Sequence, residues 1–154
     1  MIKDEEAVLK SLHTYFKANL NANITLLNTE KNDFTIDTIT ADDDHFVFGG
    51  ELLEIPNRMF VNFAIADINI KTNHTDIIQE IGLMIEVAMD NPKKENAYFK
   101  SLRYMRSVYK TTLAYGASAS EVDDLQITKA LPMETTHLGR TLLVSGVELS
   151  LAIG

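Results

Sequence analysis

Few residues in this sequence have the types and spacings that catalysis or ligand binding requires. The four histidines stand apart and lack metal-ligand spacing; they are His13, His45, His74 and His137. The absence of cysteine removes disulfides, thiolate metal sites and cysteine nucleophiles together. Gly49-Gly50 lacks the lysine of a phosphate-binding loop, and Ser145-Gly146 lacks the context of a nucleophile elbow. We therefore expect a protein that is not an enzyme, without catalytic residues, cofactor or metal.

The acidic run Asp42-Asp43-Asp44, which His45 follows, is the best local candidate for a cation site. Hard cations bind clustered oxygens, but the run lacks the spaced Asp/Asn residues, the glycine and the terminal glutamate of an EF-hand loop. The plainer interpretation, which we favour, is a solvated loop tip.

A concentration of basic residues is the most unusual feature of the sequence. Six of the fourteen lysines and arginines lie between positions 93 and 110 of a chain with a formal charge of −8. Arg103, Arg106 and Lys110 recur at i, i+3 and i+7, so they share one face of a predicted helix. The candidate interface residues are Lys94, Lys100, Arg103, Arg106 and Lys110.

Two interpretations of this basic face remain open. Charge on an exposed helix stripe is normal, so the face can simply be solvated. Alternatively, it docks against the acidic surface of a neighbouring subunit or against DNA phosphate, contacts that the planar fork of arginine favours. Such charge asymmetry suits head-to-tail association into rings. In that case, reversing the charges of Arg103 and Arg106 should disrupt assembly and leave the fold intact.

Length and composition indicate one globular domain. The chain has 154 residues, of which 45% are hydrophobic and 23% charged, as in ordinary soluble domains. The acidic balance argues against nucleic-acid binding and against attraction to anionic membranes. No apolar run approaches the roughly 20 residues that cross a bilayer, and the charged N-terminus lacks the apolar core of a signal peptide. We therefore expect a soluble protein made in a cytoplasm.

The first half of the chain predicts one helix and several short strands. Apolar residues recur at helical spacing over residues 4–20, and Asn21-Ala22-Asn23 is expected to end this helix. Residues 29–58 are interpreted as a long loop or hairpin with a turn at Gly49-Gly50. The predicted strands are 24–28, an edge strand over 34–39 and the start of another at 45–48.

The second half predicts two long strands, a helix and two further strands. Residues 59–71 are expected to be covered on both faces, and 77–89 to form a strand, although helix is an alternative for 77–81. A helix over 95–115, ending at Gly116, carries an apolar stripe made of Tyr98, Leu102, Met105, Tyr109 and Leu113. The last strands are 125–130 and 141–153, joined through Pro132 and Gly139, with a bulge at Ser145-Gly146. This order predicts a single α+β domain over residues 1–154, with two main helices packed on one face of a mixed or antiparallel sheet.

Several segments of the second half together resemble a known family. They are Leu83–Asp90, Tyr98–Tyr115 around Leu102-Arg103-Tyr104-Met105-Arg106, Leu125–Leu131 and Leu142–Ile153. A strand that leads into a helix containing arginine and tyrosine, followed by two C-terminal strands, is similar to the tail terminator (neck) proteins of tailed bacteriophages and related contractile particles. The resemblance covers about the last 75 residues, and the N-terminal helix is compatible with it.

The resemblance implies a structural virion protein that forms a hexameric ring at the head-proximal end of the tail. Such a ring caps the tail tube, joins it to the head-completion or connector protein, and lets DNA pass through its lumen without sequence-specific binding. It implies a place in the virion tail or neck after synthesis in the host cytoplasm, with no membrane partner. Arg103, Arg106 and Lys110 become candidate interface residues. The loop from Asp42 to Gly50 becomes a candidate contact with a tube or connector subunit.

Other interpretations stay open. A head–tail connector or a tail tube subunit would also oligomerise, and the symmetry of the particle would distinguish it from a terminator. A small cytoplasmic enzyme with a dispersed site, or an adaptor that binds one protein partner, belongs to a different class. Turnover in a strict monomer would identify the enzyme.

Overall fold

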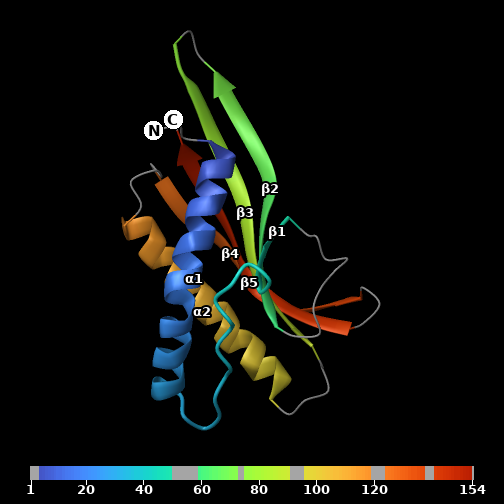
Figure 1. Cartoon of the computed structure of the whole chain (residues 1–154). Coiled ribbons are helices and arrows are strands. Elements are labelled where there is room, and N and C mark those ends of the chain that lie inside the picture. The colour runs from blue at the N-terminus through green and yellow to red at the C-terminus, as the bar shows by residue number, and fades with distance from the viewer. Residues whose placement is uncertain are drawn as a thin grey trace.

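The computed structural model describes residues 4–49, 59–72, 75–90, 96–118, 124–137 and 141–153. These residues form two helices and five strands, which Figure 1 colours in chain order. The helices are α1 (Glu5–Glu30) and α2 (Ala97–Ser118). The strands are β1 (Phe46–Phe48), β2 (Phe60–Thr72), β3 (Ile77–Asp90), β4 (Asp124–His137) and β5 (Thr141–Ile153).

All five strands belong to one mixed sheet, in the order β1-β2-β3-β5-β4. β1 and β2 run parallel, and the three other neighbouring pairs are antiparallel. Both helices lie on the same face of this sheet (Figure 1). The predicted fold class, α+β with helices packed on one face of a mixed sheet, is therefore confirmed.

The main core lies between the helices and the sheet. The two inner strands β3 and β5 contribute alternate side chains, as the two-residue period of a strand requires: Ile81, Leu83, Ile85 and Val87, and Val147, Leu149, Leu151 and Ile153. A smaller cluster of Phe60, Ala88 and Leu142 is one position out of phase with these residues, so it lies on the opposite face. The predicted strands 77–89 and 141–153 are confirmed, and the helical alternative for residues 77–81 is wrong.

Helix α1 extends well past residue 20, where the sequence predicts its end. Its N-terminus is capped by Asp4, whose Oδ1 atom accepts a hydrogen bond from the Ala7 amide at 2.7 Å. The predicted stop at Asn21-Ala22-Asn23 and the predicted strand 24–28 are wrong, because the buried stripe of the helix continues to Leu27. The asparagines do not end the helix, since their side chains bond to groups elsewhere in the fold and not to the adjacent backbone.

Helix α2 buries the face opposite to its apolar stripe. An apolar helix stripe normally faces the core, but here Tyr98, Tyr109 and Leu113 are exposed. The buried face is rich in hydroxyls; it consists of Ser101, Arg103, Tyr104, Ser107, Val108, Thr111, Thr112 and Tyr115. Ser107, Thr111 and Thr112 each donate to the carbonyl four residues earlier, at 3.0, 2.8 and 2.8 Å. These bonds satisfy buried hydroxyls within the helix itself, so small polar side chains can pack inward. The helix also runs through Gly116, its predicted stop.

The last two strands differ from the prediction at an irregular point in β4. This strand runs through Pro132, which the sequence places in the connection between two strands. The pairing shifts between Leu131 and Glu134, so β4 carries one extra residue opposite Ser145, whereas β5 pairs with β3 without irregularity. The bulge predicted at Ser145-Gly146 of β5 thus lies on β4, where a proline fits because it lacks the amide that a regular ladder uses. Gly139 lies outside the described residues.

Of the long loop or hairpin predicted for residues 29–58, the described residues 31–45 form a loop, and the edge strand predicted over residues 34–39 is wrong. Residues 31–45, which we call the strap, form no strand, lie along the helices and lead into β1 (Figure 1). β1 confirms the strand expected from residue 45 onward, and Gly49, with a φ of 65°, confirms the turn that follows it. Because β1 pairs in parallel with β2, the two strands are not the arms of a hairpin. Residues 50–58 lie outside the described part of the chain.

Candidate functional site

The predicted basic face of α2 is divided between buried and exposed side chains. Arg106 is exposed, and Lys100 is half-buried. The Lys110 Nζ atom lies 3.5 Å from Glu30 Oε2, so this lysine pairs with the end of α1. Lys94 lies outside the described residues. The side chains therefore do not form the continuous basic surface that their spacing suggests.

Arg103, the central member of the predicted basic face, is only 9% exposed and serves the fold. Its Nη1 atom donates to the Lys31 carbonyl at 3.2 Å and to the Phe34 carbonyl at 2.6 Å, and its Nη2 atom donates to the Asp33 carboxylate. The guanidinium carbon lies 3.6 Å from the centroid of the Phe34 ring, a cation–π contact. The bond from Arg103 lowers the pKa of the Asp33 carboxyl below its ordinary value. Arg103 thus fastens the start of the strap and is not available to a partner in this conformation.

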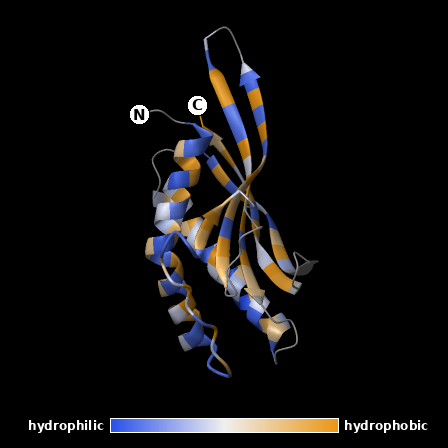
Figure 2. Ribbon diagram, turned by 45° about the vertical axis from the view of Figure 1, so that its right-hand side comes forward, coloured by the Kyte–Doolittle hydropathy of each residue, from blue (hydrophilic) through white to orange (hydrophobic). Residues whose placement is uncertain are grey.

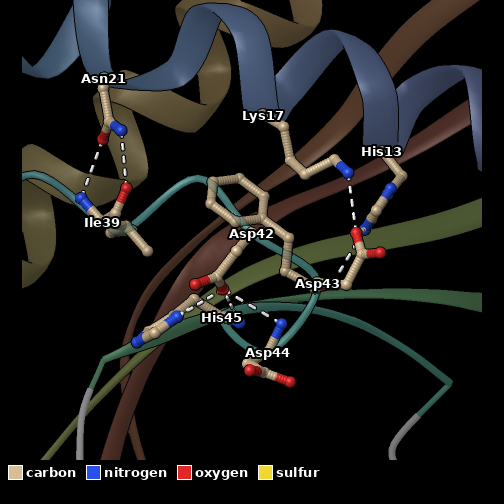
Figure 3. A network of polar contacts seen from close by, with 9 residues as sticks. His13, Lys17, Asn21, Ile39, Asp42, Asp43, Asp44 and His45 are labelled. Atoms are coloured by element: carbon tan, nitrogen blue, oxygen red, sulfur yellow. Dashed lines mark hydrogen bonds and ion pairs between the residues drawn. The ribbon is translucent and has the colours of Figure 1, made fainter.

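Side chains of α1 hold the rest of the strap through matched pairs of hydrogen bonds. Asn21 donates from Nδ2 to the Ile39 carbonyl at 2.6 Å and accepts from the Ile39 amide at 2.8 Å (Figure 3). Asn28 makes the same two contacts with Ile36, both at 2.9 Å. Each asparagine side chain therefore makes the same pair of hydrogen bonds, one donated and one accepted, that the backbone of a neighbouring strand would make. From α2, the Tyr104 hydroxyl donates to a strap carbonyl, that of Asp37, at 2.7 Å, and burial raises the pKa of the Tyr104 hydroxyl above its ordinary value.

Further contacts between α1 and the chain that follows the helix lie closer to the N-terminus of α1. Lys17 Nζ donates to Asp43 Oδ1 at 2.7 Å, and the buried His13 donates from Nε2 to the Phe46 carbonyl at 2.9 Å (Figure 3). The His13 ring also stacks on Phe48, with 4.4 Å between the ring centroids. Residues 13, 17, 21 and 28 lie on one stripe of the helix, so the strap runs antiparallel to α1 and reaches β1 in a fixed register.

We expect Asn21→Asp to destabilise the protein by about 2 kcal/mol at neutral pH, because the second carboxylate oxygen would face the Ile39 carbonyl and replace a donor. The deficit should shrink in acid, where the protonated carboxyl can donate again. Chemical denaturation at several pH values measures this. Asn19→Asp is the matched control, since among the described residues the Asn19 side chain donates to the Tyr15 carbonyl of its own helix and not to the strap. A loss as large in the control would contradict the role given to Asn21.

The acidic run forms a turn, which is stabilised by hydrogen bonds to the side chain of its first residue, Asp42. The Oδ1 atom of Asp42 accepts from the amides of Asp44 and His45, at 3.1 and 2.9 Å, and from His45 Nδ1 at 2.6 Å. These contacts, with the His45 side chain first, lower the pKa of Asp42, and the bond from Lys17 lowers the pKa of Asp43. Within the described ranges, no group of three or more histidine, aspartate or glutamate side chains could hold a metal ion. Asp43 and Asp44 are the members of this loop that a partner could reach.

The outer face of α2 is an apolar surface that sequence reasoning did not identify as exposed. Its exposed or half-buried members are Tyr98, Phe99, Leu102, Met105, Arg106, Tyr109 and Leu113. A hollow of about 470 Å³ opens where this face meets the strap, and Phe34, Phe99 and Arg106 are among the residues that line it. The stripe was visible in the sequence, but nothing in its spacing distinguishes an outward face from a core-facing one.

A second exposed apolar surface lies at the outer ends of β2 and β3. We call residues 66–72 and 75–80 the projecting hairpin, because this part extends beyond the helices (Figures 1 and 2). The expectation that β2 is covered on both faces is correct only for its first residues, since every residue from Ala66 onward is exposed. Four isoleucines are exposed there: Ile68 and Ile70 on β2, and Ile77 and Ile78 on β3. The sequence signal for this exposed surface was the presence of apolar residues on both faces of β2.

Comparisons with known proteins do not assign the chain to a family. No protein-family model matches the sequence, and no curated protein matches it. Among the helices in the described part of the chain, none has both the length and the apolar character needed to cross a membrane.

Proposed function

We propose that this chain is a structural, non-enzymatic subunit of a homo-oligomeric ring, and that the ring is the tail terminator of a tailed bacteriophage. The observation that supports assembly is the outer face of α2, an apolar stripe on a helix that buries hydroxyls instead. Soluble monomers rarely leave large contiguous apolar patches uncovered, so such a surface indicates a partner. The sequence resemblance supplies the particular ring, its hexameric symmetry and its place at the head end of the tail.

The face of the sheet opposite the helices supports a lumen that does not hold DNA. A hollow of about 380 Å³ on this face is lined by Asp67, Glu80 and Glu148 among other residues. Carboxylates repel phosphate, so DNA would slide past such a surface and not bind to it. In this proposal the tail tube protein and the head-completion or connector protein bind the two rims of the ring. The exposed Asp43 and Asp44 are candidates for one rim contact.

Native mass spectrometry of the full chain, followed by a tube assembly assay, tests the proposal. The expected particle has six copies of the 17.2 kDa subunit, and its addition to the polymerising tail tube protein of the same phage should limit tube length in electron micrographs. A chain that stays monomeric at high concentration would contradict the ring. A twelvefold particle would favour a head–tail connector, and incorporation along the tube would favour a tube subunit; either result would reject the terminator.

A further inference from the structure

We propose that the projecting hairpin of one copy docks on the outer face of α2 of the next copy. This inference rests on the proposed ring and names the two surfaces that close it. It commits to a second copy of the chain as the occupant of both surfaces.

The projecting hairpin continues the core face of the sheet past the point where the helices cover it. Ile68 pairs across the strands with Ile81, a core residue, and so shares its face. Ile70 follows at the next position on the same face, and Ile77 lies there by the two-residue period of β3. Ile70 and Ile77 are each 61% exposed, the largest exposed fractions among the big apolar side chains of the described residues. Isoleucines therefore dominate this face, which also includes Gln79 between Ile77 and Ile81, and it has no cover within the described chain.

The outer face of α2 has the matching properties of an acceptor. Tyr109 and Leu113 are exposed on a regular helix, and aromatic and apolar side chains of this kind dominate the buried centres of interfaces. The hollow beside Phe99 and Arg106 adds a concave region at the N-terminal half of the helix. A ridge of isoleucines can pack against such a surface without disturbing the hydroxyl-lined face that holds α2 to its own subunit.

Charge favours pairing the two different surfaces over pairing like with like. α2 contains four basic residues and no acidic residue; Arg103 is buried against Asp33 and Lys110 pairs with Glu30, so Lys100 and Arg106 are the ones that give a partner an excess of positive charge. The projecting hairpin carries Asp67, Asp76 and Glu80 against a single Lys71, a net charge of −2. Asp67 and Glu80 lie on the face opposite Ile70 and Ile77, and Glu80 pairs with Lys71 at 2.9 Å, so the attraction acts through the net charge of the hairpin. Two α2 faces would bring positive charges together and two hairpins would bring negative charges together. The contact between unlike surfaces is the attractive one.

The positions of the two surfaces imply a head-to-tail contact. The hairpin projects at one end of the subunit, whereas α2 begins near the other end (Figure 1). A single subunit therefore cannot cover its own α2 with its own hairpin in this conformation. When one surface of each copy meets a different surface of the next, the assembly closes into a ring if the rotation permits.

Complementation between two defective variants tests this contact. Ile70→Lys with Ile77→Lys puts charge into the apolar tip, and Tyr109→Lys with Leu113→Lys puts charge of the same sign on the outer face of α2, so that the two altered surfaces repel each other in the mixture. Each double variant alone is expected to be a folded monomer, checked by circular dichroism. An equimolar mixture should form a dimer of twice the 17.2 kDa subunit mass, because one intact hairpin meets one intact α2 face. Native mass spectrometry measures all three samples.

The outcomes separate this inference from the proposed function. If the unmodified chain forms no ring, both fail together. If the unmodified chain forms a ring and either double variant still does, or if the mixed variants remain monomeric, the ring stands and the hairpin–α2 contact is overturned. Leu26→Lys is the matched control: Leu26 is 49% exposed on α1, outside both surfaces, and its replacement should leave the ring intact. Loss of the ring in this control would also overturn the assignment of these two surfaces.

Discussion

Gly146→Ala is expected to destabilise the protein by about 3 kcal/mol, or roughly 10 °C in its thermal midpoint. A Cβ atom at position 146 would lie 2.0 Å from the Ile85 carbonyl oxygen and 2.8 Å from the Glu86 Cα atom. Both atoms belong to the backbone of β3, which is paired on both sides and cannot withdraw without breaking its hydrogen bonds. Urea denaturation of the variant measures the loss.

Gly82→Ala provides the control for the Gly146 prediction. A Cβ atom at position 82 would lie 2.1 Å from Asp67 Oδ1, which is the tip of an exposed and rotatable side chain. The carboxylate can turn away, and alanine is better suited than glycine to a strand interior, so the change should stay within about 1 kcal/mol. Equal losses in the two variants would show that the close approach of the Ile85 carbonyl is not what requires glycine at position 146.

Arg103→Ala is expected to cost about 3 kcal/mol, because it removes the donors that satisfy two strap carbonyls and leaves the Phe34 ring without its cationic cover. Arg103→Lys should recover only part of this loss, since one ammonium cannot reproduce the fork of a guanidinium that bonds Lys31, Asp33 and Phe34 at once. Chemical denaturation of both variants measures the cost.

Arg106→Ala is the matched control for the Arg103 prediction, because it removes an exposed arginine one helical turn away. Its effect on the free energy of unfolding should stay within about 0.5 kcal/mol. If Arg103→Ala were equally mild, the contacts with the strap would not stabilise the fold. The expectation that reversing both arginines spares the fold is therefore revised: of the two arginines, only Arg106 can be changed to test assembly without disturbing the fold.

The two inner strands were the most predictable part of the fold, whereas the strands predicted over residues 24–28 and 34–39 are absent. The alternation of Leu83, Ile85 and Val87, and of Val147, Leu149 and Leu151, defines two inner strands directly, because burial on one face imposes a period of two. The order of helices and strands then led to the correct fold class. The parallel pairing of β1 was not predictable. Its direction depends on the path of the strap, which sets where β1 begins beside β2, and not on residues 46–48 themselves.

Two of the misplaced features have separate physical causes: one polar side chain has a distant partner, and others have partners within their own helix. Asparagine at Asn21 was taken as a helix stop, but its partner is Ile39, eighteen residues along the chain. Thr111 and its neighbours bond within α2, which lets polar residues take the buried face that apolar residues normally occupy. The apolar stripe of α2 therefore lies on the outside of the subunit, and the candidate surface could be found only in the structure.

The strap has a further consequence for how the native state fluctuates. Its amides at Ile36 and Ile39 are held by asparagine side chains and not by a ladder of backbone bonds. The strap is thus a separate unit of local cooperativity, which can open while the sheet stays closed. Opening would uncover the buried Ile36 and Ile39 and the apolar stripe of α1 beneath them. We therefore expect the strap to lift at a lower cost in free energy than opening of the sheet, with β1, the short edge strand that follows it, as the next part to detach.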